Sequence, residues 1–110
     1  MTPHEILAAG RELLSNPDHW TKGAPARDRK GESIIPYDPK ATCFCTIGAI
    51  HKVVGPQQLE LKRQVVGYLI EALDTGHKVS AILSAFNDHP KTSHDQVLEL
   101  WDKAIEIARH

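Results

Sequence analysis

Apolar residues recur three and four positions apart in five stretches of the chain, a spacing that places them on one face of an α-helix. We expect helices over residues 3–15, 45–54, 57–74 and 79–86, and a last helix that follows a cap at Thr92 or Ser93. In the third stretch, apolar positions 61, 65, 69 and 73 lie four apart. The last stretch has so wide an apolar face that we expect it to pack against several neighbours.

Residues at the helix ends support this assignment. Thr2 and Glu5 have the spacing of a capping box, and Pro3 suits the first helical position. Ser93 and Gln96 repeat the box before the last helix. Turn-forming residues at 16–17, 55–56 and 87–90 are expected to end the first, second and fourth helices.

Residues 16–42 keep no helical period and are rich in proline and glycine. Two short strands are predicted inside this insert, Trp20–Lys22 and Ser33–Ile35, with a turn at 29–32 between them. A loop of this length is uncommon in a compact domain unless it contains strands or carries function. The predicted fold is therefore mainly α: a single domain, residues 1–110, with about five bundled helices and a short β-hairpin or irregular insert.

Composition and charge narrow the class of protein. The 110 residues are 41% hydrophobic and 25% charged, which excludes a strongly disordered chain. A net charge of −1 lacks the positive field typical of nucleic-acid-binding proteins, so we do not expect a nucleic-acid partner. No apolar run approaches the length of a membrane helix, and the first residues lack the features of a signal peptide. We therefore expect a cytoplasmic protein with no membrane partner.

Several short motifs occur in a fixed order along the chain. They are Trp20-Thr21-Lys22-Gly23-x-x-Ala26-Arg27-Asp28, Cys45-x-x-Gly48-Ala49, Asn87-Asp88, and Thr92 before the closing helix. With these motifs, residues 11–109 resemble a family of small uncharacterised proteins of bacteria and phages, classed as a domain of unknown function. The resemblance implies where the fold begins and ends and which surface carries the function. It implies no activity.

The polar motif in the insert is the first candidate site. Trp20, Lys22, Arg27 and Asp28 are predicted to bind a ligand, because loops carry binding groups more often than helix interiors do. The two cations suit a phosphate or carboxylate. In the structural alternative, Trp20 covers the edge of the core while Arg27 and Asp28 hold the hairpin by hydrogen bonds.

Asp88 completes the predicted ligand-binding set. Its carboxylate would face Arg27 or Lys22 across a pocket. The alternative for Asn87 and Asp88 is an Asx-turn, in which the side chain bonds the backbone two residues on. Positive charge at Arg29 and Lys30 adds to the insert.

Cys45 is the alternative catalytic residue. It stands at a predicted helix start, where backbone N–H groups favour a thiolate, and a distant histidine could serve as base. A packed thiol is the more common state of such a residue. We expect no disulfide with Cys43, which is two positions away, and no metal site, because the Cys43-x-Cys45 spacing is too tight for the common zinc pattern.

The sequence thus predicts a small cytoplasmic binding or regulatory protein, with an anionic small molecule or an acidic protein surface as its partner. No cofactor is predicted. The alternatives are a cysteine-dependent enzyme that uses Cys45 as nucleophile, and a structural module of a larger assembly. The sequence leaves the oligomeric state open.

Overall fold

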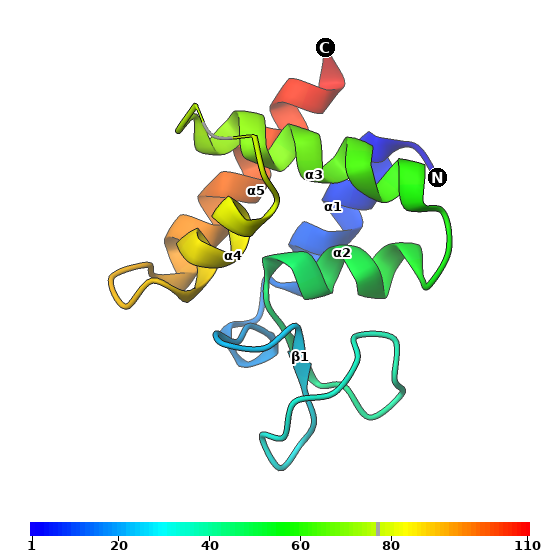
Figure 1. Ribbon diagram of the computed structural model, residues 1–110, viewed down its shortest axis with the longest axis vertical. Coiled ribbons are helices and arrows are strands. Elements are labelled where there is room, and N and C mark those ends of the chain that lie inside the picture. The colour runs from blue at the N-terminus through cyan, green and yellow to red at the C-terminus, as the bar shows by residue number, and fades with distance from the viewer. Residues whose placement is uncertain (77) are drawn as a thin grey trace.

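The computed structural model describes residues 1–76 and 78–110, which form five α-helices and a small antiparallel sheet between the first two helices (Figure 1). The helices are α1 (Pro3–Leu13), α2 (Thr46–Val54), α3 (Leu59–Leu73), α4 (Ala81–Asp88) and α5 (His94–Arg109). A short 3₁₀ helix, η1 (Pro17–His19), precedes the strands β1 (Ala26–Arg27) and β2 (Cys43–Phe44). The predicted fold class, a helical bundle with an insert between the first two helices, is confirmed.

Both predicted capping boxes are confirmed. The Thr2 hydroxyl accepts a hydrogen bond from the Glu5 backbone N–H at 3.2 Å, and the Glu5 carboxylate accepts one from the Thr2 N–H at 2.9 Å. Ser93 and Gln96 form the same pair of bonds at 3.2 and 2.8 Å. These bonds satisfy N–H groups that a helix start leaves without partners, which is why α1 and α5 begin where the sequence predicts.

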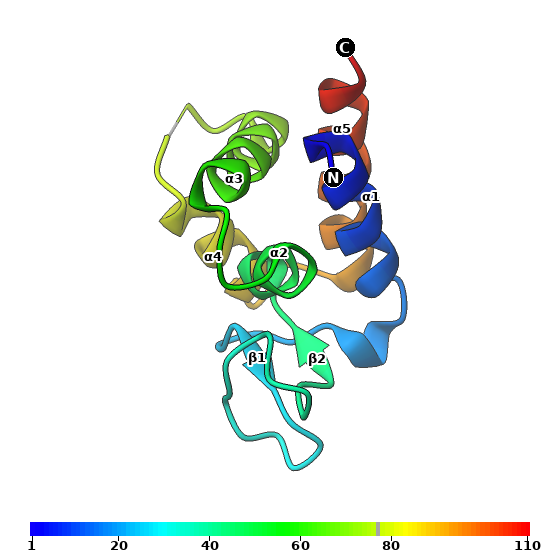
Figure 2. The same cartoon turned by 90° about the vertical axis from the view of Figure 1, so that its right-hand side faces the viewer.

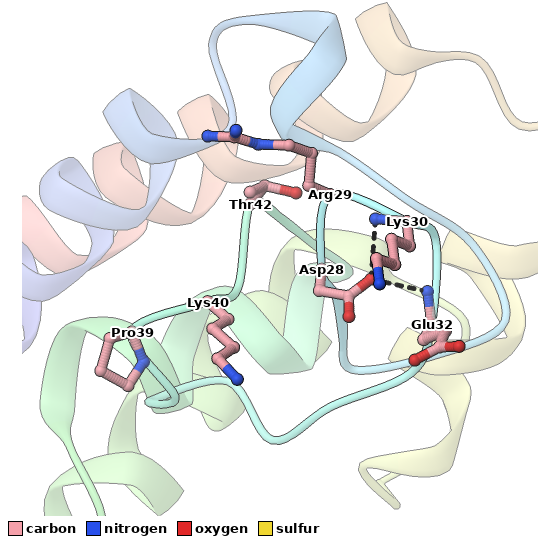
Figure 3. Close-up of a pocket in the computed structure, with 7 residues that line it drawn as sticks. All are labelled: Asp28, Arg29, Lys30, Glu32, Pro39, Lys40 and Thr42. Carbon is pink, nitrogen blue, oxygen red and sulfur yellow. Dashed lines mark hydrogen bonds between the residues drawn. The ribbon is translucent and has the colours of Figure 1, made fainter.

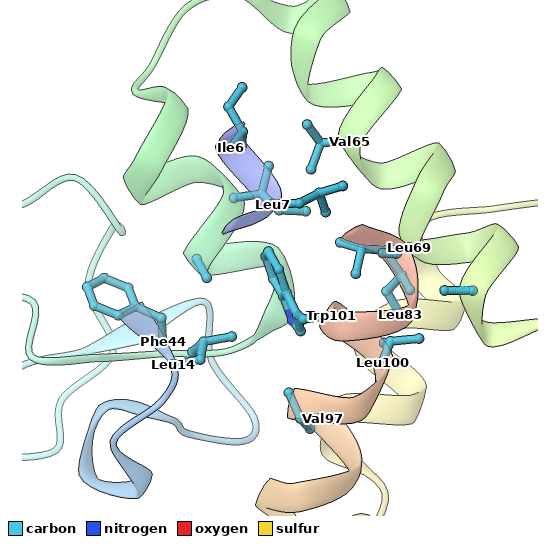
Figure 4. Packing of buried hydrophobic residues seen from close by; sticks show 14 of the residues in the cluster. Ile6, Leu7, Leu14, Phe44, Val65, Leu69, Leu83, Val97, Leu100 and Trp101 are labelled. Atoms are coloured by element: carbon cyan, nitrogen blue, oxygen red, sulfur yellow. The ribbon is translucent and has the colours of Figure 1, made fainter. Parts of the chain in front are cut away.

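The core lies between α1, α3 and α5, with α2 and α4 closing it from below in Figure 2. Trp101 of α5 is fully buried at its centre, surrounded by aliphatic side chains from several helices (Figure 4). Gly10 of α1 lets the helix approach this indole, since an added Cβ there would lie 2.4 Å from the Trp101 Cζ3. Among the described helices, none is both long and apolar enough to span a membrane.

The fourth helix differs from the prediction at both ends. It runs from Ala81 to Asp88 rather than over 79–86, so Asn87 and Asp88 belong to its last turn. The Asx-turn prediction for Asn87 was wrong, because this side chain hydrogen-bonds to segments distant in sequence. Those tertiary bonds support two more helical residues, and the helix ends at His89, before Pro90.

The predicted strand pairing in the insert was also wrong. Instead of residues 20–22 pairing with 33–35, β1 pairs with β2 in the register Ala26 to Phe44 and Arg27 to Cys43. Ser33 and Trp20 make isolated bridges, to Arg27 and Phe44 respectively. The observed pairing buries Ala26 (0% exposed) and Phe44 (3%), whereas Ile35 in the predicted strand stays 58% exposed. Burial against the bundle therefore decides the pairing.

Candidate functional site

The amide of Asn87 joins the insert to the helical bundle. Its Oδ1 accepts hydrogen bonds from Trp20 Nε1 at 2.8 Å, Thr46 Oγ1 at 2.9 Å and the Thr46 backbone N at 3.1 Å. Its Nδ2 donates to the Thr21 carbonyl at 3.0 Å and to Asp88 Oδ1 at 2.9 Å. The side chain is fully buried, and both of its N–H donors are used. We call these five residues the Asn87 network.

Lys22 lies beside this network, and Asp88, a member of it, makes a further bond to the insert. Asp88 Oδ1 accepts a hydrogen bond from the Gly23 N–H at 3.0 Å. Lys22 Nζ donates to the His89 carbonyl at 2.6 Å and lies 5.4 Å from the centroid of the Trp20 ring. The structure therefore brings together the predicted site residues Trp20, Lys22 and Asp88, through internal bonds that fix the insert to the end of α4.

Arg27 links residues 21–22 of the insert to Gly31 at its turn. Its Nε donates to Thr21 Oγ1 at 3.1 Å, one terminal nitrogen donates to the Lys22 carbonyl at 2.9 Å, and the other donates to the Gly31 carbonyl at 3.0 Å. All three guanidinium nitrogens thus bond the insert itself. These bonds fix the conformation of residues 21–31.

Asp28 organises the turn at the tip of the insert. Its Oδ1 accepts hydrogen bonds from the backbone N–H groups of Lys30 and Glu32, both at 2.9 Å (Figure 3). Gly31 adopts φ +83°, a left-handed conformation that suits glycine. The turn is therefore built by local bonds around one carboxylate.

A surface hollow of about 580 Å³ lies at this tip (Figure 3). It is lined by residues of the turn at 28–32 and of the segment 39–42, which leads back to β2. Three cations line it: Arg29, Lys30 and Lys40. Within the described residues, their side chains have no hydrogen-bond or ion-pair partner, and all three residues are exposed. We call this the tip hollow. The sequence showed Arg29 and Lys30 only as local charge, and it gave no reason to place Lys40 beside them.

Cys45 is the N-cap of α2. Its Sγ accepts a hydrogen bond from the Gly48 N–H at 3.3 Å, and the residue is 6% exposed. Burial raises the pKa of the thiol above its ordinary value, outweighing the backbone N–H bonds that lower it, and the charge of Asp88 raises it further. The thiol is therefore protonated near neutral pH, which suits a packed cap and not a nucleophile.

Two histidines distant from Cys45 in sequence, His89 and His94, have partners of their own. His94 Nε2 lies 2.6 Å from the Leu14 carbonyl oxygen, and the His89 ring accepts a hydrogen bond from the Lys91 N–H at 3.0 Å. In the part of the chain that the structure describes, no three histidine, cysteine or carboxylate side chains gather as metal ligands would.

We expect iodoacetamide to alkylate Cys43 in the folded protein and to spare Cys45. Cys43 is partly exposed, whereas the Cys45 thiol is buried and its pKa is raised. Mass spectrometry of digested protein should show Cys45 labelling at least about tenfold slower in buffer than in urea. Rapid labelling of Cys45 in the folded state would restore the cysteine-enzyme alternative.

Comparison with known proteins identifies the family of this chain. The model of a family of unknown function, DUF6197, covers residues 1–107. This chain belongs to DUF6197. No curated protein and no solved structure matches it. Membership of DUF6197 supplies no activity, so the candidate site depends on the geometry described above.

Proposed function

We propose that this protein is a small cytoplasmic binding or regulatory protein whose insert takes an anionic ligand, or an acidic partner surface, at the tip hollow. One observation carries the proposal: Arg29, Lys30 and Lys40 surround the hollow without partners of their own in the described chain. Exposed cations gathered on a folded turn attract phosphate or carboxylate groups. Two carboxylates also line the hollow, Asp28 and Glu32. Asp28 is already engaged by two backbone N–H groups, so it competes less than Glu32 for these cations, and the three cations still outnumber the two carboxylates.

The residues that the sequence predicted as ligand-binding have a supporting part in this proposal. Hydrogen bonds of Trp20, Lys22 and Asp88 attach the insert to α4 and the residue that follows it. Hydrogen bonds of Arg27 and Asp28 stabilise the insert itself, including its turn. A site whose frame is fixed before binding loses less conformational entropy when the ligand arrives. Direct contact between the ligand and Lys22 or Arg27 stays a prediction.

The test is a variant in which Arg29, Lys30 and Lys40 are all replaced by alanine. Tripolyphosphate and a hexaglutamate peptide, titrated separately and followed by amide NMR, should cause saturable shifts at residues 28–32 and 40–42 of the unchanged protein. The variant should lose at least about tenfold in affinity, because three charges are removed. Its unfolding free energy should stay within about 0.5 kcal/mol, since these side chains bond nothing internal.

A matched control removes the same charge elsewhere. Lys52, Lys91 and Lys103 are exposed lysines outside the tip hollow, and their triple alanine variant should keep the affinity. Equal losses in the two variants, or no saturable shift at the tip with either probe, would contradict the proposal. Loss with one probe only would identify which anion the tip prefers.

A further inference from the structure

A second depression lies on a different face of the bundle, between α2 and α3, with the segment 78–80 at one end. Figure 1 shows these two helices running across the same face, with the chain that enters α4 beside them. The depression has a volume of about 440 Å³ and shares no residue with the tip hollow. We call it the α2–α3 groove.

The groove is elongated and has an apolar floor. Along α3, positions 59, 62, 66, 67 and 70 line it, a strip that spans about 16 Å at the helical rise of ~1.5 Å per residue. Ile47 of α2 faces this strip, and Val66 and Ile70 continue the apolar surface. Leu59 is 62% exposed at one end, and Val79 is 63% exposed beside the other end. Such exposed aliphatic surface on a bundle is typical of a binding groove.

Lys62 lines this groove, and most of its side chain is buried. The residue is only 8% exposed, and the described chain provides no hydrogen-bond or ion-pair partner for its ammonium group. His51 lines the same groove. Burial lowers the pKa of His51, and the positive charge of Lys62 lowers it further. In the described chain the buried polar side-chain atoms without a partner are His4 Nε2 and Trp101 Nε1, so the Lys62 ammonium reaches solvent from its buried stem. An anion that enters the groove would find this ammonium group accessible and not already paired.

All charged residues that line the groove in the described chain are basic. Besides Lys62, they are Arg63 and Lys78, and Arg63 has only a loose exposed contact of 3.8 Å with Glu60. The apolar floor and the basic rim together complement a molecule with an anionic head and an apolar body.

Gly67 is an independent indication that the groove is kept open. It lies in the interior of α3, where glycine costs about 0.5–1 kcal/mol relative to alanine. A Cβ added there would meet no atom within 4 Å, so internal packing does not explain the glycine. It lines the groove, and a side chain at this position would narrow the space.

We propose that the α2–α3 groove binds a small, elongated amphipathic carboxylate, with its anionic head beside Lys62 and His51 and its hydrocarbon body along Ile47, Val66 and Ile70. The volume lies within the range of small-molecule sites, roughly 300–1,000 Å³. This site goes beyond the proposed function, because its residues and its ligand class differ from those of the tip hollow.

The test uses monomeric dodecanoate as the probe. Calorimetry should show saturable binding, and NMR shifts should be confined to α2, α3 and the His51 ring. Lys62→Met should weaken binding by at least about tenfold, and Lys62→Arg should retain most of the affinity. Lys52→Met, an exposed lysine of α2 outside the groove, is the matched control and should bind as the unchanged protein does.

Two further measurements separate this site from nonspecific adsorption. Gly67→Leu adds a side chain at a position that lines the groove, and its Cβ would meet no atom within 4 Å, so the variant should abolish binding while helical content is retained. Dodecyltrimethylammonium has a similar chain with the opposite charge and should bind at least about tenfold more weakly. Equal binding of both surfactants, equal effects of Lys62→Met and Lys52→Met, or binding only to anionic vesicles or acidic peptides would overturn the proposal.

Discussion

Asn87→Ala is expected to lower the free energy of unfolding by about 3–5 kcal/mol. The substitution removes five hydrogen bonds at once and leaves three donors, Trp20 Nε1 and both donors of Thr46, without their acceptor. A buried donor without a partner costs about 1–3 kcal/mol. Urea denaturation should report the loss, and hydrogen exchange should show the largest gain in the insert, because the Asn87 network is its main polar attachment to α4.

Two variants make this result specific. Asn16→Ala removes the only other asparagine, whose side chain caps η1 with one exposed hydrogen bond, and it should cost about 1 kcal/mol or less. Asn87→Asp keeps the acceptor and replaces the amide donor with a second carboxylate next to Asp88. Its destabilisation should be greatest near neutral pH and smaller below about pH 4, where one carboxyl group is protonated. Equal stability of Asn87→Ala and Asn16→Ala would show that the network contributes little.

Gly48→Ala is expected to destabilise the protein by at least about 3 kcal/mol. A Cβ at this position would lie 1.7 Å from the Pro25 carbonyl oxygen, a backbone atom that cannot rotate away. The same carbonyl accepts a hydrogen bond from the Cys45 N–H at 3.1 Å, so moving it also breaks the contact between the insert and the start of α2. Thermal unfolding followed by circular dichroism should show the loss.

Gly67→Ala is the matched control for this substitution. Both glycines lie within helices, but an added Cβ at position 67 meets nothing, so the better helix propensity of alanine should raise the unfolding free energy by about 0.5–1 kcal/mol. The two glycine-to-alanine changes should therefore have opposite signs. If both stabilise the protein, the close approach of α2 to Pro25 is not maintained in solution.

The structure brings some of the predicted site residues together, while their binding of a ligand stays a prediction. Trp20, Lys22 and Asp88 lie together, and their polar atoms bond the chain itself. For Arg27 and Asp28, hydrogen bonds within the insert were one of the two alternatives that the sequence left open. Asn87 was considered only as a turn residue, although its place in an Asn-Asp motif was a signal. Lys62 was not identified from the sequence as a candidate binding residue, although the pattern of α3 indicated it. It lies three residues before Val65 on the apolar face of α3, where a cation is unexpected.

The five helices follow from the sequence alone, because their determinants are local. Apolar spacing and the capping boxes act between residues three or four positions apart, so Thr2 with Glu5 and Ser93 with Gln96 could be recognised directly. The tertiary structure decided the strand pairing, the role of Asn87 and the environment of Lys62. The bonds of Asn87 to Thr46 and Trp20 join positions 41 and 67 residues apart, and burial of Ala26 and Phe44 selects the strand register. Such partners are chosen by the packing of whole elements, which a local pattern of residues does not specify.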